Sequence, residues 1–370
     1  NEYFNGLIEA AHWISYAIED SYGYYKDPFQ FYLAKGKHTL TIESVKEPVA
    51  IGGITFKNLP SARSYAEVLN EWKKNGATDA TENLPILEAE KSDRKSDSIL
   101  TPTYDRNSSK TTPISCETIK MNIISSDKWQ QAGQWLEWEI DVKQSGLYKM
   151  AFRVRQNTND GMLCTRKLLI DGNVPFAEAE NITVGYDTKW QIVTLGKDQE
   201  PYYIYLEKGR HTLRLQNTLG ETAEVLVKVN GILQQLNQCY REIMMITGAS
   251  PDTYRDYKLD KLIPDTIENL GKQSKALEEA MNDMRAKTGI KGSYLAPLDR
   301  LMIETKEMSE DHTRIPKLFD SFENNIGSLA AWITSSQAQP LDIDKIYLVT
   351  PDYELPKAED NFFVQLWHDV

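Results

Sequence analysis

Two distant stretches of this 370-residue chain carry nearly the same pattern, and this internal repeat constrains the fold more than any other feature. Residues 28–44 read PFQFYLAKGKHTLTIES, and residues 201–217 read PYYIYLEKGRHTLRLQN. In each copy, apolar and polar residues alternate on both sides of a Lys-Gly pair, which is the pattern of a β-hairpin. The repeat therefore predicts two related β-domains.

The second copy closes a longer β-rich segment. Residues 86–93, 134–142, 146–157 and 166–176 are short runs that alternate in polarity and end in turn residues. This pattern is typical of a β-sandwich or jelly roll, so we expect a complete sandwich over residues 86–219.

The first copy lacks every strand that precedes these closing strands. Residues 1–57 are therefore predicted to be the C-terminal half of a first sandwich. Half a sandwich exposes its strand edges and its core, so a partner chain could complete residues 1–57. Residues 58–85 are expected to be a linker that contains a helix.

After Leu219 the apolar period changes from two to about three and a half residues. Four helical segments with apolar stripes and short connections predict an antiparallel helical bundle over residues 220–340. Residues 341–370 are expected to form a strand and the start of a helix that leads into a further domain.

Composition excludes several classes of function. The net charge is −12, and no Lys/Arg cluster offers the basic face that a nucleic-acid partner requires. No apolar stretch approaches the roughly 20 residues of a membrane span. The sequence also has no G-x-S-x-G, Walker or H-E-x-x-H motif, so we expect a protein that is not an enzyme and has no catalytic residues.

A sugar site needs an aromatic platform and planar polar groups. Tyr104 and Trp129, in predicted loops, could meet Arg155, Gln156 and Asn157, at a predicted strand end, on one rim of the sandwich. Two alternatives stay open, because Trp129 could pack against a neighbouring domain and Arg155 could form a structural ion pair.

Glu88 and Glu90 are the candidate cation ligands. They lie two residues apart on a predicted strand, so both carboxylates would face the same side and could bind calcium through oxygen. The alternative is a pair of solvated or Lys/Arg-bonded acids. No cofactor other than this structural calcium is expected.

Eight stretches carry a resemblance to known proteins: ILEAEKSDRKSDS, WQQAGQWLEWEIDV, GLYKMAFRVRQN, LLIDGNVPFAEAENI, YLEKGRHTLRL, YRDYKLDKLIPDTIENLGKQSKAL, SFENNIGSLAAWI and FFVQLWHD. Together they resemble a family of large extracellular solute-binding proteins from Gram-positive bacteria. In that family, two galactose-binding-like sandwiches and a helical insert precede the substrate-binding domain of a carbohydrate ABC transporter.

This resemblance implies a non-catalytic carbohydrate-binding, substrate-presenting region of a lipoprotein that is extracellular and anchored at the cell surface. Its partners would be an oligo- or polysaccharide and, through a domain beyond Val370, the transporter permease. The alternatives are a structural spacer without ligand and an accessory part of a glycoside hydrolase.

The sandwich also resembles carbohydrate-binding modules of families six and thirty-five, through Glu88-Ala-Glu90 and the LLIDG of residues 168–172. Those modules complete a calcium site with a closing Asn-x-Asp strand. Here TLGETAEVLVKV stands in its place and runs into a helix.

Overall fold

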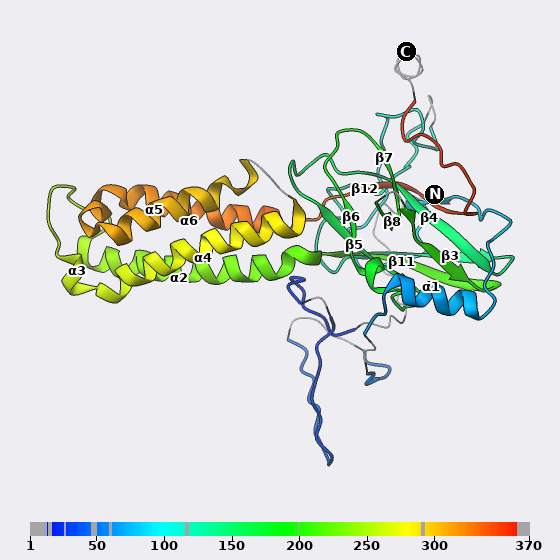
Figure 1. Cartoon of the computed structure of the whole chain (residues 1–370), viewed down its shortest axis with the longest axis horizontal. Helices are drawn as coiled ribbons and strands as arrows, with labels where there is room; N and C mark the ends of the chain where they lie inside the picture. Colours follow the sequence, from blue (N-terminus) through cyan, green and yellow to red (C-terminus); the bar gives the residue numbers. More distant parts are fainter. Residues whose placement is uncertain are drawn as a thin grey trace, which may run out of the picture.

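A β-sandwich and a helical bundle make up most of the structure, a computed structural model that describes residues 13, 17–25, 27–45, 50–58, 61–114, 118–198, 200–289 and 293–360. The bundle projects from one end of the sandwich (Figure 1). The predicted fold class is confirmed. The predicted helix start within residues 361–370 lies outside the described residues.

Among the described residues, the sandwich consists of two five-stranded sheets. The first sheet has the order β1 (Leu87–Glu88), β12 (Asp342–Val349), β4 (Gly146–Arg155) and β10 (Tyr203–Leu206), with β7 (Gln191–Thr194) also paired to β4. The second has the order β2 (Arg94–Lys95), β3 (Trp135–Val142), β11 (Gly209–Thr218), β5 (Cys164–Ile170) and β6 (Ile182–Val184). A short pair, β8 (Gly196–Lys197) and β9 (Glu200–Pro201), follows β7.

The core lies between the two sheets because alternate side chains of each strand point inward. Met150, Phe152 and Val154 of β4 are buried in the same apolar cluster as Leu213 and Leu215 of β11. Burying a side chain of this size contributes about 1.5–3 kcal/mol. The opposite residues of β4, including Arg153 and Arg155, therefore lie on the outer face of the first sheet.

The bundle is an insertion within the sandwich. The chain leaves the second sheet after β11, forms the helices, and returns as β12 between β1 and β4 in the first sheet. Residues 86–219, the range predicted for a complete sandwich, therefore lack a central strand of the first sheet.

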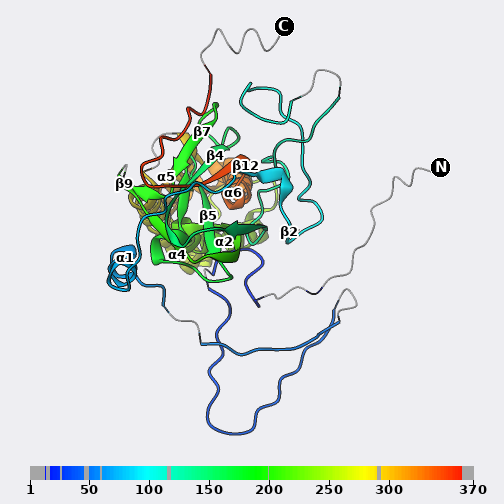
Figure 2. The same cartoon turned by 90° about the vertical axis from the view of Figure 1, so that its right-hand side faces the viewer.

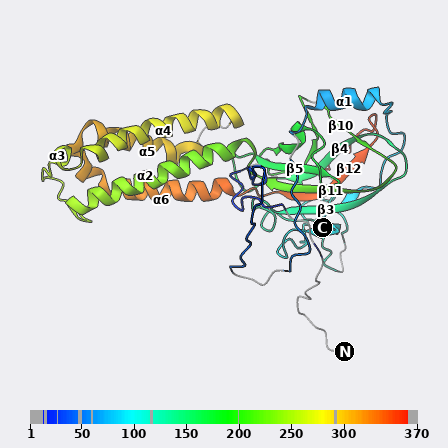
Figure 3. The same ribbon diagram turned by 90° about the horizontal axis from the view of Figure 1, so that it is seen from below.

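The bundle contains four long helices, seen side by side from below in Figure 3. They are α2 (Ala223–Thr247), α4 (Pro264–Thr288), α5 (Ala296–Glu310) and α6 (Ile315–Gln337), with the short α3 (Leu259–Leu262) before α4. Tyr240 of α2 stacks on Phe319 of α6 with ring centroids 4.8 Å apart. None of the described helices is long and apolar enough to cross a membrane.

The second repeat copy is an arch between the sheets. Strand β10 pairs with β4 in the first sheet, whereas β11 pairs with β3 and β5 in the second. The prediction of a β-hairpin at 201–217 is therefore wrong. Alternating polarity around a Lys-Gly turn fits both arrangements, and only the partners of each strand distinguish them.

The first repeat copy forms no helix or strand in its described residues. Figure 2 shows this segment looping away from the sandwich. Phe31 and Leu40 are 60% and 55% exposed, whereas their repeat counterparts Ile204 and Leu213 are buried. The half-sandwich over residues 1–57 remains a prediction.

The predicted linker helix is present as α1 (Tyr65–Lys74), which begins at a capping box formed by Ser64 and Glu67. Tyr65 packs against Tyr202 and Phe176 of the sandwich, with ring centroids 4.3 and 5.0 Å apart. The helix is thus fixed to the sandwich by an aromatic cluster.

Candidate functional site

Trp129, the predicted sugar platform, lies in the core of the sandwich. Its side chain is 0% exposed and is part of the apolar cluster between the sheets. The guanidinium of Arg166 lies over the indole, 4.2 Å from the ring centroid. The loop that carries Trp129 folds inward, so the expectation of a solvent-facing platform is corrected.

Arg155 and Gln156 are also buried, at the end of β4. Arg155 donates to Asp342 of β12 from Nε and Nη2, at 2.9 and 2.8 Å. Gln156 donates through Nε2 to the carbonyls of Asn159 and Met162. The structure therefore favours the ion-pair alternative for Arg155.

Of the five predicted sugar-site residues, only Tyr104 and Asn157 keep part of their surface in solvent. Arg106 lies over the Tyr104 ring at 5.7 Å. The structure thus does not assemble the five residues into one exposed rim.

Arg153, next to Arg155 on the outer face of β4, is 1% exposed. It pairs with Asp344 of β12 and donates to Thr111 Oγ1 and Ser108 Oγ, both at 2.8 Å. The guanidinium lies 4.5 Å from the ring centroid of Trp190. Ser108 and Thr111 lie in one loop, Trp190 directly precedes β7, and Asp344 lies on β12, so the cluster joins three distant parts of the chain.

Residues 350–360, which we call the strap, cover part of this outer face. Tyr353 and Leu355 pack on an apolar cluster that contains Tyr347. Lys149 Nζ donates to the carbonyl of Tyr353 at 2.5 Å, and Arg153 Nε donates to that of Ala358 at 3.0 Å. The strap therefore occupies sheet surface that an external ligand would otherwise reach.

Glu88 and Glu90 lie beside Asp344. Glu88 ends β1 opposite Lys345, and Glu90 follows in a short 3₁₀ helix rather than on the predicted strand. Burial raises the pKa of Glu90 to about 7 and that of Asp344 to about 6, although Arg153 opposes the shift at Asp344.

Four carboxylate oxygens of this cluster are buried without a hydrogen-bond partner in the described part of the chain: Glu88 Oε2, both Glu90 oxygens and Asp344 Oδ1. Such oxygens fit a hard cation. However, no three His, Cys, Asp or Glu side chains among the described residues are already arranged as a metal site. One oxygen of Asp344 is instead taken by Arg153.

Sequence reasoning did not connect Asp344 with Glu88 and Glu90. The Asp342-Ile-Asp344 pattern lies on β12, whereas residues 218–229, TLGETAEVLVKV, stand where the related modules have their closing Asn-x-Asp strand. The two acids of β12 are visible in the sequence, but the inserted bundle separates them from the strands before it.

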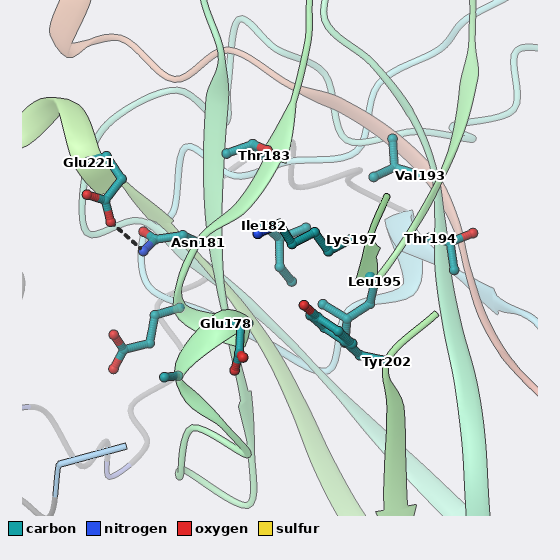
Figure 4. Close-up of a pocket in the computed structure, with 13 residues that line it drawn as sticks. Glu178, Asn181, Ile182, Thr183, Val193, Thr194, Leu195, Lys197, Tyr202 and Glu221 are labelled. Carbon is teal, nitrogen blue, oxygen red and sulfur yellow. Dashed lines mark hydrogen bonds between the residues drawn. The ribbon is translucent and has the colours of Figure 1, made fainter. Parts of the chain in front are cut away.

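An open groove of about 610 Å³ lies on the side of the sandwich. One wall consists of β6 and the 3₁₀ helix Ala177–Glu180, and the other of β7, β8 and Tyr202. Figure 4 shows Lys197 and the hydroxyl end of Tyr202 reaching across the groove toward the first wall. None of the predicted sugar-site residues lines it.

Comparison with known proteins gives one family match. Residues 224–339 match the family model described as bacterial solute-binding protein, 4-helix bundle domain. This range is the inserted bundle and covers less than half of the chain. No curated protein matches the chain.

Several solved structures are similar to parts of the chain. A Paenibacillus cycloisomaltooligosaccharide glucanotransferase, complexed with cycloisomaltoheptaose, is 19% identical over 42% of this chain and 22% of its own, with a TM-score of 0.27. A family 35 carbohydrate-binding module from Clostridium thermocellum is 18% identical over 37% of this chain and 87% of its own, with a TM-score of 0.26. A Podospora anserina GH26-CBM35 β-(1,4)-mannanase is 11% identical over 69% of this chain and 64% of its own, also with a TM-score of 0.26. The chain thus spans only 22% of the first of these proteins.

Proposed function

We propose that this chain is a non-catalytic, extracellular carbohydrate-binding region of the solute-binding protein of an ABC transporter, and that it presents glycans to the transporter at the cell surface. The observation that carries this proposal is the match of residues 224–339 to the bundle domain of bacterial solute-binding proteins. The permease and the cell-surface anchor of a lipoprotein belong to the proposal as its expected partners.

The architecture supports a role in presentation. The bundle leaves the sandwich after β11 and returns as β12, so two chain connections join the units. Met162 of the sandwich lies in the apolar core of the bundle, and Gln339 accepts a hydrogen bond from Thr165 N at 2.7 Å. The two connections and these contacts hold the sandwich in one orientation relative to the bundle.

Binding of soluble polysaccharides by the full chain tests the proposal. We expect retardation in affinity gels that contain at least one of dextran, galactomannan or arabinoxylan, with a Kd of about 0.1–1 mM for its oligosaccharide by calorimetry. A weak affinity is expected because well-hydrated hydroxyls yield little net free energy. Absence of binding across a broad glycan array would favour the spacer, while release of reducing ends would indicate a glycoside hydrolase.

We further propose that Glu88, Glu90 and Asp344 hold a structural calcium ion, which would supply positive charge to their unpartnered oxygens. Because Asp344 lies on β12, such an ion would tie the strand that follows the bundle to β1, which precedes it.

Calcium is expected to raise the melting temperature of the chelator-treated protein. At about a hundred times its Kd, a ligand that binds only the folded state adds about 2.7 kcal/mol. Glu90→Gln should reduce this increase, whereas Glu139→Gln, at an exposed residue of β3, should leave it unchanged. Identical melting curves with calcium and with chelator would rule out the site.

A further inference from the structure

We propose that the groove between β6 and β7 binds an uncharged oligosaccharide chain. This inference rests on the proposed carbohydrate binding and assigns a site to it. It replaces the rim predicted from the sequence, where Trp129, Arg155 and Gln156 are buried.

The two walls of the groove are the free edges of the two sheets. Among the described strands, β6 pairs only with β5, and β7 pairs only with β4. Their outward backbone N–H and C=O groups are therefore available for hydrogen bonds with a ligand. The paired segments are short, with Ile182–Val184 on one side and Gln191–Thr194 on the other. Such edges suit the hydroxyls of a sugar better than the long edge that an added peptide strand needs.

The side chains that line the groove offer both donors and acceptors. Lys197 is exposed and makes no described ion pair, and the Tyr202 hydroxyl points across the groove (Figure 4). On the opposite wall lie the carboxylates of Glu178 and Glu180 and the hydroxyl of Thr183. A sugar hydroxyl both donates and accepts, so it can use both walls at once.

The charge of the groove selects against acidic sugars. Three carboxylates, those of Glu178, Glu180 and Glu221, line the groove with a single ammonium, that of Lys197. A uronic acid would meet like charges there without enough cations to balance them, which favours an uncharged ligand.

A second hollow continues the groove and indicates a ligand longer than one sugar. It has a volume of about 410 Å³, shares Thr194, Gly196 and Lys197 with the first, and ends at Lys149 and the strap residue Leu355. Gly196 keeps the β8–β9 turn compact at this junction, since a Cβ there would lie 2.2 Å from the carbonyl oxygen of Glu200. A chain can therefore pass Lys197 and occupy both hollows.

The test uses the full chain with two groove variants and two matched controls. Lys197→Ala removes the ammonium, and Tyr202→Phe removes the hydroxyl while it keeps the ring that packs on Tyr65. The controls are Lys306→Ala and Tyr254→Phe, at exposed residues of the bundle region. Affinity is measured with dextran, galactomannan and arabinoxylan in gels, and with their mono- and hexasaccharides by calorimetry.

We expect each groove variant to raise the Kd for the bound hexasaccharide about 3- to 10-fold, the cost of one lost hydrogen bond. The controls should bind like wild type, and the monosaccharide should bind more weakly than the hexasaccharide. Wild-type binding that both groove variants retain in full would overturn the groove and leave the proposed function standing. Absence of binding to all three wild-type probes would overturn the groove together with the proposed carbohydrate binding.

Discussion

Replacing Trp129 with alanine is expected to lower the free energy of unfolding by about 3–5 kcal/mol, because truncation of a buried tryptophan leaves a cavity in a packed core. The change also removes the aromatic face on which Arg166 rests, 4.2 Å from the ring centroid. Arg166 is itself buried, and its Nε has no hydrogen-bond partner among the described residues. The loss should appear in chemical denaturation of the full chain.

Two further variants separate packing from a general effect of tryptophan removal. Trp129→Phe keeps an aromatic ring beside Arg166 and should cost less than the alanine variant. Trp13→Ala, at a residue that is 75% exposed, should leave stability within about 0.5 kcal/mol of wild type. If Trp129→Ala instead abolished glycan binding at unchanged stability, the loop platform predicted from the sequence would be correct.

Local patterns were sufficient to predict the helices of the bundle. The stripe that begins at Leu226 and Val229 and continues to Leu236 and Ile243 is buried in α2. Helix α2 ends at Gly248, whose φ of 77° lies in the left-handed region that favours glycine. These predictions depend only on neighbours within a few residues along the chain.

Partnerships between distant segments could not be predicted in the same way. The sequence predicts a strand within residues 341–370, but nothing local places β12 between β1 and β4 across an inserted bundle. Residues 201–217 show the same limit of local patterns, because their alternating polarity fits a hairpin as well as an arch between the sheets. Strand pairing is set by the whole core, which periodicity does not describe.

The residues predicted for the sugar site do not meet on an exposed rim, for a related reason. Loop position and residue type suggested that Trp129 and Arg155 face solvent, and aromatic and guanidinium groups do suit sugar recognition. Both side chains are instead covered by segments distant in sequence: Arg166 lies over Trp129, and Asp342 pairs with Arg155. The groove residues have no motif of their own and meet only because two sheet edges lie opposite each other.

The second large effect is expected at the buried ion pair of Arg153 and Asp344. Arg153→Met should cost about 3–5 kcal/mol, because it leaves the buried Asp344 carboxylate with only the ammonium of Lys345, 3.8 Å away, as a cation. The cost should be measured by chemical denaturation in chelator, so that a bound cation does not compensate for the lost guanidinium. Arg94→Met, which removes a half-exposed guanidinium 3.5 Å from Glu137, should cost less than about 1 kcal/mol.

The destabilisation caused by Arg153→Met is expected to increase with pH. Burial already raises the pKa of Asp344 to about 6, and Arg153 is the strongest influence that lowers it. Without Arg153 the folded-state pKa rises further above its unfolded value, so the folded variant binds a proton that the unfolded chain releases. The stability of the variant is therefore retained at low pH and lost as the pH rises through that higher pKa. We expect the difference in stability from wild type to grow between about pH 5 and pH 8.

The double variant Arg153→Met/Asp344→Leu is the control. Because it removes both charges, it should recover much of the lost stability and abolish this growth with pH. A cost that is independent of pH would show that lost packing of the Arg153 side chain, not an unpaired carboxylate, destabilises the variant.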